Sequence, residues 1–474
     1  MTEIKKNVVV GIDFGTTNSL IAFVNEDSKV IVVPINEDAD YATLLPSVVR
    51  YESAEKIIEV ISIKRLINNS VKGDLIDYFS AESLDLKKDA ISMAAQIFQN
   101  LKDKAEEYTK STITDAVVTV PAHFNDFARM NIKAAAESAG FNVIRMINEP
   151  TAAAIAHCML DNSSDRSIVV YDLGGGTFDV SILQVKDGIF RVISTNGDST
   201  LGGDDFDIAL AELLDAKCGF DGEIITSDAI LCARKIKERL SLNENYTGFW
   251  KGNEISCTRD EFEAATEALV DKTFDVMRAA LDDAELTLND IDEVIFVGGA
   301  TKMPIIKKKA RQYMHRTDIL GNDILPEEAV VIGAAMHANS ITQSANHLLL
   351  DVIPLSIGIE VFGGAVECII PRNTPIPIMA RSVFTNSHEK QASFDIHVIQ
   401  GDGERVAQCK TLARFKVPIA DKIKRQEAKL EVLFCVDVNG ILSITAVEKA
   451  GGTTRDIIVQ PQYDLSEEDI TPSL

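Results

Sequence analysis

The chain has 474 residues, 46% of them hydrophobic and 25% charged, which is enough for more than one hydrophobic core. Its formal net charge of -25 argues against nucleic acid as a partner, because proteins that bind a phosphate backbone carry a basic face. No apolar run is long enough to span a membrane, the start is too polar for a secretory signal, and seven dispersed cysteines predict reduced thiols, so we expect a cytoplasmic protein.

The first predicted element is a hairpin that ends near Val24. An apolar strand ends at Asp13, then Gly15, Thr16 and Thr17 form the tip, and a second apolar strand begins after Asn18. Glycine at a tip lets backbone amides approach an anion, and a nearby carboxylate can hold the water shell of a divalent cation. Taken alone, the pattern also fits a tight turn without a ligand.

The next segments predict alternating strands and helices. We expect one edge strand over residues 45–49, helices over 85–110 and 126–139, and a strand over 116–120 that ends at Pro121. Lys64 lies in an apolar run, where it could reach a terminal phosphate, although a lysine beside an arginine is usually a solvated surface group.

Glu149 stands where a predicted strand, residues 143–147, meets an alanine-rich helix. Such junctions lie at the ligand edge of an α/β sheet. An acidic residue in a first helical turn also stabilises the helix dipole, and for an isolated residue that explanation is the simpler one.

Residues 168–182 repeat the plan of the first hairpin. An apolar strand ends at Asp172, the tip is Gly174, Gly175, Gly176 and Thr177, and the strand pattern then resumes. The 159 residues between Asp13 and Asp172 are too many for a solenoid repeat and suit a duplicated domain. Two such hairpins facing each other would hold a polyphosphate from both sides.

Further glycine pairs follow the second hairpin. Gly202 and Gly203 precede an acidic helix start at Asp204, and a buried strand runs into Gly298 and Gly299, which we interpret as a floor for a nucleoside. Residues 326–335 predict a helix of small residues that packs closely behind this floor.

The pattern changes near residue 346, where helical spacing gives way to short alternating segments. An Asn-Gly pair at 439–440 between two such segments is a strong hairpin signal. We predict a small all-β domain over residues 354–462. The leucine-rich connector before it is unusual for a linker, so it is either the first strand of the β domain or a switch that docks and undocks.

Six motifs follow one another along the chain: Gly11–Ser19, Val120–Asp126, Asn148–Ala154, Asp172–Asp179, Leu201–Asp207 and Leu348–Gly358. In this order they resemble the heat shock protein 70 family over nearly the whole chain. Shorter motifs lie near residues 371–374, 412–415, 250–255 and 460–463, and through them the chain is most similar, within the family, to the HscA type of iron-sulfur cluster assembly chaperone.

The resemblance implies a two-lobed, actin-like (ribonuclease H-like, duplicated) α/β ATPase domain over residues 1–345, a linker over 346–353, the β-sandwich domain over 354–462, and the start of a helical lid over 463–474. It implies ATP or ADP as ligand, with Mg²⁺ and K⁺. Lys64, Glu149, Asp172 and Thr177 match catalytic positions, and Asp13, Glu149 and Asp172 match positions that hold the metal through water. The positions that would surround the nucleotide are Asp13, Gly15, Thr16, Thr17, Asn18, Gly174, Gly175, Gly176, Thr177, Gly202, Gly203, Asp204, Lys237, Ser241, Gly298, Gly299, Lys302 and Glu327.

The resemblance also implies partners and a relay. We expect a monomer that binds a J-domain co-chaperone of the HscB type and an IscU-like scaffold or another client peptide, with no nucleic acid or membrane. Client-lining positions would be Ile359, Phe362, Phe384, Phe394 and Ile396, although for Ile396 a place in the β core is an equal alternative. Interdomain positions would be Pro121, Arg129, Arg145, Leu348, Leu349, Leu350 and Asp351.

Several positions depart from the family pattern. At the adenosine pocket, Arg234 stands where many relatives have Glu, Glu238 where some have Arg, Ala300 where Ser is common, and Lys302 where a stacking Arg is usual. Lysine stacks less well than arginine, so we expect weaker adenine affinity. Three other functions stay open at this point: a general unfolded-protein chaperone, a sugar kinase with an actin-like fold, and a catalytically silent scaffold.

Overall fold

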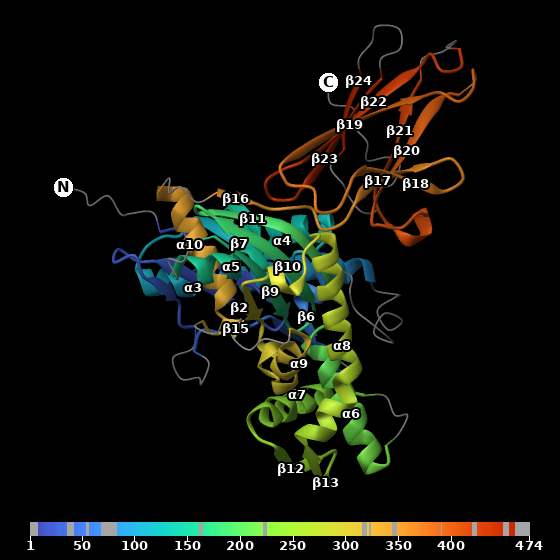
Figure 1. The fold of residues 1–474 in the computed structure, drawn as a ribbon. Coiled ribbons are helices and arrows are strands. Elements are labelled where there is room, and N and C mark those ends of the chain that lie inside the picture. Colours follow the sequence, from blue (N-terminus) through green and yellow to red (C-terminus); the bar gives the residue numbers. More distant parts are fainter. Residues whose placement is uncertain are drawn as a thin grey trace, which may run out of the picture. The chain divides into compact units, whose positions relative to one another are not determined.

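The computed structural model describes residues 8–35, 42–53, 56–67, 83–160, 165–220, 225–314, 320–321, 324–343, 348–389, 391–419, 424–448 and 455–459. They form two compact units. The first contains the residues up to His123 together with Ile132–Leu349, and the second contains Phe124–Asn131 and the residues from Leu350 onward. Figure 1 labels their elements.

The first unit contains two sheets with the same plan. The strand order of the first sheet is β3 (Val30–Val32), β2 (Asn18–Val24), β1 (Val10–Phe14), β7 (Asp115–Val120) and β8 (Asn142–Asn148), with β4 (Leu45–Pro46) beside β2. The order of the second is β16 (Leu348–Leu350), β11 (Ile189–Asp198), β10 (Phe178–Lys186), β9 (Arg166–Leu173), β14 (Glu293–Val297) and β15 (Leu320–Gly321). In each sheet an antiparallel hairpin continues into two parallel strands, which confirms the predicted duplication.

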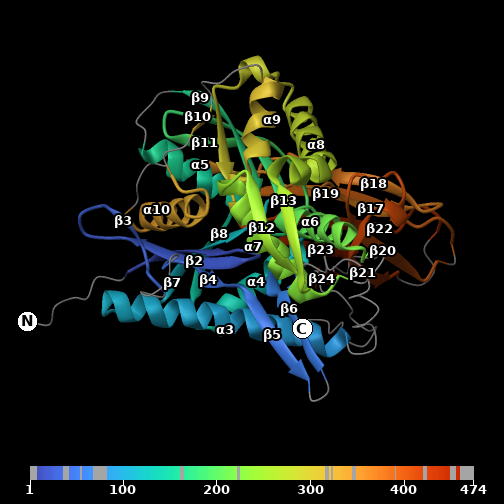
Figure 2. The same ribbon diagram turned by 90° about the horizontal axis from the view of Figure 1, so that it is seen from below.

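Helices cover both sheets (Figures 1 and 2). Small residues bring α10 (Ala329–Gln343) close to β1 and α5 (Glu149–Leu160), because a Cβ on Gly11 would lie 2.1 Å from the nitrogen of Ala335 and one on Gly333 would lie 1.7 Å from the carbonyl oxygen of Ala152. We predicted this close packing behind the Gly298 turn, and the structure places it against β1 and α5 instead. The other helices of this unit are α1 (Ile63–Ile67), α3 (Ser83–Thr109), α6 (Gly203–Cys218), α7 (Ser227–Leu242), α8 (Arg259–Asp283), η1 (Leu288–Asp290), η2 (Gly299–Lys302) and α9 (Pro304–Met314). Helix α4 (Asp126–Ser138) begins among residues of the second unit and ends in the first.

Local sequence fixes where several helices begin and end. Thr258 caps α8 through a reciprocal pair of hydrogen bonds with Glu261, of 3.1 and 2.8 Å. Thr226 caps α7, and Gly219 ends α6 in the left-handed conformation at φ 77°. The helix predicted over 326–335 begins later, at Ala329, because a turn in which Glu328 donates to the carbonyl of Leu325 comes first.

The predicted edge strand 45–49 is two strands. β4 pairs with β2, whereas β5 (Val48–Ser53) pairs with β6 (Lys56–Ser62) in a separate hairpin. Ser47 separates them, because its backbone nitrogen donates to Thr17 and its side chain forms a buried 2.7 Å hydrogen bond with Ser19. A second isolated hairpin joins β12 (Asn245–Trp250) and β13 (Asn253–Thr258).

The second unit is a β sandwich. One sheet has the order β18 (Ala365–Ile370), β17 (Ile357–Val361), β20 (Ser393–Gln400) and β21 (Lys410–Pro418); the other has β19 (Ile378–Thr385), β22 (Lys429–Val436), β23 (Leu442–Glu448) and β24 (Arg455–Val459). A single apolar core lies between them, and η3 (Val406–Gln408) precedes β21. The predicted Asn439–Gly440 hairpin joins β22 to β23. The leucine-rich connector is not a strand of this sandwich, because β16 belongs to the second sheet of the first unit.

Candidate functional site

The two predicted hairpin tips lie against each other in the first unit. A Cβ on Gly175 would lie 2.2 Å from Thr17 Oγ1 and 3.7 Å from Thr16 Cβ, so the second tip reaches the first only because Gly175 has no side chain. Thr16 and Thr177 are buried, and Gly15 and Asn18 are half-buried beside them. Hydroxyl groups of the first hairpin therefore face bare backbone of the second.

A lysine and three carboxylates are buried near these tips. Lys64 lies on α1 with 2% of its surface exposed, and its ammonium donates to Glu149 Oε1 at 2.5 Å. Glu149 is the first residue of α5. Asp13 and Asp172 are the last but one residues of β1 and β9, and their carboxylates interact electrostatically with this pair. Lys64 is therefore a buried charge, and its interpretation as a solvated surface residue is wrong.

Burial raises the pKa of all three carboxyl groups. It raises the pKa of Glu149 to about 7, although Lys64 opposes the shift. The pKa of Asp172 is raised well above its usual range by burial and then by the neighbouring charges of Glu149 and Asp179. The pKa of Asp13 is also raised by burial, while Lys64 and a 3.0 Å hydrogen bond from Thr119 lower it. Three carboxylates crowded around one ammonium favour the addition of a cation.

The second tip is fixed to the start of α6. The backbone nitrogens of Gly203 and Asp204 donate to the carbonyls of Gly174 and Gly175, both at 2.8 Å. A Cβ on Gly202 would lie 2.6 Å from the backbone of Gly176, so only glycine allows this approach. The two predicted glycine turns are thus one continuous structure.

Helix α7 is tied to α6 by ion pairs. Lys237 Nζ donates to the carbonyl of Gly203 at 2.9 Å and lies 2.7 Å from the carboxylate of Asp207, which is completely buried. Arg234 bridges Asp207 at 2.9 Å and Asp204 at 2.5 Å. Burial lowers the pKa of Arg234, but the carboxylates of Asp207 and Asp204 together raise it above its usual value. Arg234 therefore links α7 to α6 through ion pairs.

The predicted nucleoside floor lies next to Asp172. Gly298 adopts a left-handed conformation at φ 83°, and a Cβ there would lie 2.3 Å from the carbonyl of Leu173 and 3.0 Å from the carboxylate of Asp172. Gly299 begins η2, and Lys302, at the end of η2, forms an ion pair with Glu327. The structure brings all these predicted residues into one unit.

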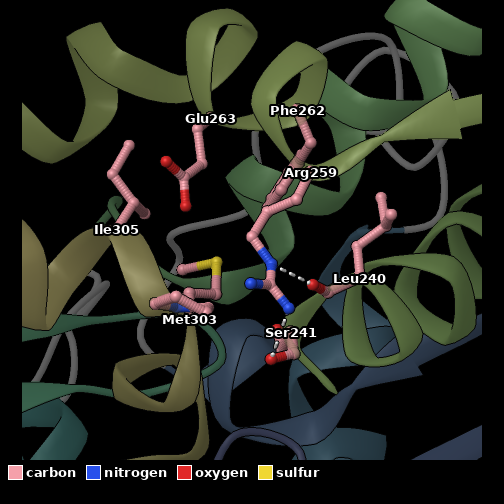
Figure 3. A pocket seen from close by; sticks show the side chains of 8 residues that line it. Leu240, Ser241, Arg259, Phe262, Glu263, Met303 and Ile305 are labelled. Atoms are coloured by element: carbon pink, nitrogen blue, oxygen red, sulfur yellow. Dashed lines mark hydrogen bonds between the residues drawn. The ribbon is translucent and has the colours of Figure 1, made fainter. Parts of the chain in front are cut away.

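Figure 3 shows a pocket lined by residues from the end of α7, the start of α8 and the start of α9. Arg259, from the first turn of α8, points across it toward the end of α7, where its guanidinium donates to the carbonyls of Leu240 at 2.7 Å and Ser241 at 3.4 Å. Ser241 in turn donates to the carbonyl of Lys237 at 3.0 Å. Arg259 thus satisfies carbonyls that a helix leaves unpaired at its C-terminus.

This arrangement fits a magnesium nucleotide. Bare glycine backbone and threonine hydroxyls suit phosphate oxygens, and buried carboxylates with raised pKa values suit a hydrated cation. Over the described ranges, no three acidic, histidine or cysteine side chains lie close enough to ligate an ion directly. The prediction was contact through water, which stays a prediction.

Predicted client positions differ in exposure. Phe362 is fully exposed at the β17–β18 turn, and Phe384 is half-buried on β19. Ile359, Phe394 and Ile396 are buried in the sandwich core. For Ile396 the core alternative matches the observed burial.

The predicted interdomain residues lie just after β7, on β8, on α4 and in the connector. Pro121 follows β7, Arg145 is half-buried on β8, and Arg129 is buried on α4 with its Nε 3.3 Å from the carbonyl of Phe124. Leu348, Leu349 and Leu350 form β16, and Asp351 is buried beside Val352. Their role as a relay stays a prediction.

Sequence reasoning missed four residues that shape the site. Asp179 accepts from the backbone of His123 at 3.1 Å and raises the pKa of Asp172; it lies within the second hairpin motif and could have been found. Thr119, Asp207 and Arg259 act through contacts between distant segments, which no local pattern signals.

Known proteins resemble this chain over most of its length. Residues 79–473 match the family model described as Hsp70 protein. The chain is 40% identical to "Chaperone protein HscA homolog" of Rickettsia prowazekii, over 99% of this chain and 80% of that protein. It is also 40% identical to the protein of the same name from Methylococcus capsulatus, over 98% of this chain and 80% of that protein, and 37% identical to that from Bordetella petrii, over 99% and 81%. In the part of the chain that the structure describes, no helix is long and apolar enough to cross a membrane.

Proposed function

Because the chain belongs to the Hsp70 protein family, whose members are chaperones that hydrolyse ATP, we propose that its two hairpins hold the triphosphate and that Lys64 assists hydrolysis. The observation that carries this proposal is the buried Lys64–Glu149 pair beside the facing tips of Gly175 and Thr17. Transfer of a phosphoryl group needs positioning and charge stabilisation more than covalent chemistry.

Each group has a task that its surroundings support. Lys64 is held by Glu149 and supplies positive charge where the terminal phosphate and the attacking water would lie. Thr16, Thr17 and Thr177 offer hydroxyls to phosphate oxygens. Asp13, Glu149 and Asp172 would hold Mg²⁺ through water, and K⁺ would lie near Asp13 and Asp172. Magnesium, when bound, neutralises phosphate charge.

The nucleoside would lie between α7 and the Gly298 turn. Lys237 and Ser241 are fixed from one side, and Gly298 and Gly299 form the other. Lys302 is engaged with Glu327, which supports our expectation that adenine stacks less firmly here than on arginine.

We further propose that the chain works in iron-sulfur cluster assembly with a J-domain partner of the HscB type and an IscU-like client. The support is its similarity to proteins named HscA homologs and the exposed Phe362 on the β unit. ATP can control client binding only if it binds two arrangements of the protein with unequal affinity. We keep the division into ATPase domain, linker 346–353 and β domain as part of this proposal.

The test is ATP turnover with and without a peptide from an IscU-type scaffold. We expect the peptide to accelerate turnover, and a peptide of the same composition in scrambled order to accelerate it less. Equal acceleration by unrelated unfolded peptides would favour a general chaperone. Turnover without any peptide response would contradict client coupling, and absence of turnover would contradict the assignment of the site.

A further inference from the structure

Three strands of the β sandwich bring a glutamate, a histidine and a threonine into one row of hydrogen bonds. His397, on β20, lies between Glu360 on β17 and Thr411 on β21. Its Nδ1 is 2.7 Å from Glu360 Oε2, and its Nε2 is 2.8 Å from Thr411 Oγ1. Both ring nitrogens of this histidine are therefore engaged, by a carboxylate on one side and by a hydroxyl group on the other.

A β-bulge turns Thr411 toward the histidine. The pairing of β20 with β21 changes register at Leu412, which is the extra residue of the bulge. Leu412 and Ala413 both belong to the sandwich core, so the alternation of the strand is broken once and Thr411 comes to the outer face of the sheet. His397 lies on the same face, because its neighbour Ile396 belongs to the core. Bulges of this kind often re-aim a side chain next to an active site.

The carboxylate determines which ring nitrogen carries the hydrogen. A carboxylate accepts hydrogen bonds and donates none, so Nδ1 of His397 carries the hydrogen that Glu360 accepts. In the neutral imidazole Nε2 is then an acceptor, and the hydroxyl group of Thr411 donates to it. A hydroxyl group that donates to a base, which a third group orients in turn, is the arrangement that activates a hydroxyl nucleophile.

Solvent reaches the hydroxyl end of this row but hardly its centre. Thr411 is exposed, whereas 10% of the His397 side chain and 33% of the Glu360 side chain are exposed. The imidazole is therefore held in one orientation, while a small molecule has access to the hydroxyl group. The cation opposite His397 in the strand register, Arg414, pairs with Asp395, so it does not replace the histidine as the partner of Glu360.

We propose that Thr411 is a nucleophile that takes up the acyl group of small activated esters. Its Oγ1 attacks the acyl carbon, and Nε2 of His397 takes the hydroxyl proton. The bond between the acyl carbon and the leaving oxygen breaks, and the leaving group departs with that electron pair and then receives the proton from His397. The products are an O-acylated threonine and a free alcohol, and no atom changes its oxidation state. This reactivity is separate from the proposed ATP hydrolysis and client binding.

The experiment treats the full chain with 4-nitrophenyl acetate and locates the acetyl groups by tandem mass spectrometry. We expect Thr411 to be acetylated about 100-fold faster than Thr247, the scale of general-base assistance. Thr247 is an internal reference, because it is exposed on β12 opposite Ser256. Neutral hydroxylamine should remove the acetyl group from Thr411, because it cleaves esters and leaves the amides of acetylated lysines intact.

Variants test the role of each group. His397→Gln should bring the rate at Thr411 down to that at Thr247, because glutamine is polar but is no base near neutral pH. Glu360→Gln should slow the reaction about 10-fold, the scale of one hydrogen bond to a charged group. Thr411→Ser should still be acetylated at this position. His388→Gln, at an exposed histidine of the same unit, is the matched control and should react like the wild type.

Acetylation of Thr411 at the rate of Thr247, or at an unchanged rate in His397→Gln, would overturn the inference and leave the three residues as a structural bridge between strands. Melting temperatures show whether each variant folds. If His397→Gln does not fold, a wild-type rate in folded Glu360→Gln would overturn the inference. ATP turnover without peptide should be unchanged in Thr411→Val, so failure of this inference leaves the proposed function intact.

Discussion

The two halves of the first unit share a strand order but surround their equivalent aspartates, Asp13 and Asp172, with different groups. Asp13 lies near the end of β1 and is held by a hydrogen bond from Thr119 on the neighbouring strand. Asp172 lies near the end of β9 among the charges of Glu149, Asp179 and Asp13, which add to the effect of burial in raising its pKa. The first half thus offers a fixed carboxylate, whereas the second concentrates negative charge that a cation would relieve. The two halves therefore have the same strand plan, whereas the residues around their aspartates differ.

The hairpin tips differ in a complementary way. The first carries hydroxyl side chains at Thr16 and Thr17, and the second carries three glycines. Because Thr17 Oγ1 occupies the place that a Cβ on Gly175 would need, the two compositions depend on each other. Two identical tips rich in side chains could not approach this closely.

Removing the charge that links the halves should have the largest effect. We expect Lys64→Ala to lower single-turnover ATP hydrolysis by about 100-fold, the scale of losing one preorganised charge donor. Nucleotide binding should persist, because the tips and the α7 contacts remain. Lys186→Ala, an exposed lysine on β10, is the control and should hydrolyse ATP normally. Near-normal single turnover in Lys64→Ala would show that another group supplies the charge.

Adding one methyl group to the second hairpin tip tests whether the close approach of the two tips is needed for nucleotide binding. Gly175→Ala should weaken nucleotide affinity about 10-fold, since overpacking costs about 1–3 kcal/mol and 1.4 kcal/mol is tenfold. Gly174→Ala is the matched control, because a Cβ there has its nearest neighbour at an ordinary 3.5 Å. Isothermal titration with ADP measures both. Equal affinities in the two variants would mean that the close approach is not needed for binding.

The hairpins were predictable because their information is local. A strand, an aspartate and a glycine tip lie within a dozen residues, and the repeat of that pattern predicted the duplicated sheets that the structure contains. The burial of Lys64 was not predictable, since its partner Glu149 lies 85 residues away. Thr119 and Asp13 are 106 residues apart, and neither residue signals the other.

Other features could not be decided from the sequence because their patterns are ambiguous in principle. Alternation along β20 gives two faces without saying which is buried, so Phe394 and Ile396 fitted both a client groove and a core. The division of residues 45–49 into two strands depends on hydrogen bonds of Ser47 to Thr17 and Ser19, which no strand propensity encodes. Arg234 seemed to alter an adenosine contact, and its engagement with Asp204 and Asp207 appeared only when α6 and α7 were placed together.

The stored negative charge should make the nucleotide-free protein less stable as pH rises. The pKa of Glu149 is about 7 in the folded chain against 4.5 in an unstructured one, so the folded state holds the proton more tightly. Stability is then greatest below pH 4.5 for this group and falls as pH rises through about 7.

In a metal chelator, the melting temperature of the wild type should therefore fall more between pH 5 and pH 8 than that of Glu149→Gln, by roughly 2–4 °C. Glu254→Gln, at an exposed position on β13, is the control and should follow the wild type. If the melting temperatures of the wild type and Glu149→Gln change with pH in parallel, then burial of the ionised Glu149 carboxylate does not destabilise the folded protein. Added Mg²⁺ should reduce the fall in the wild type, because a bound cation favours the ionised carboxylates.

We expect the smallest effect from a change at Arg259, which contacts the end of α7 in the second half of the first unit. Arg259 closes the end of α7, the helix that carries Lys237 and Ser241, so Arg259→Ala should loosen that helix and raise the KM for ATP about 3-fold to 5-fold, the scale of one typical hydrogen bond. Turnover at saturating ATP should be unchanged, since the side chain of Arg259 donates to the end of α7. Arg259→Lys should restore part of the affinity because a cation still faces the helix end. Arg311→Ala, exposed on α9, serves as the control. A fall in kcat at constant KM would instead mean that Arg259 affects the hydrolysis step and not nucleotide binding. The second half of the unit would then contribute to catalysis as well as to the positioning of the nucleotide.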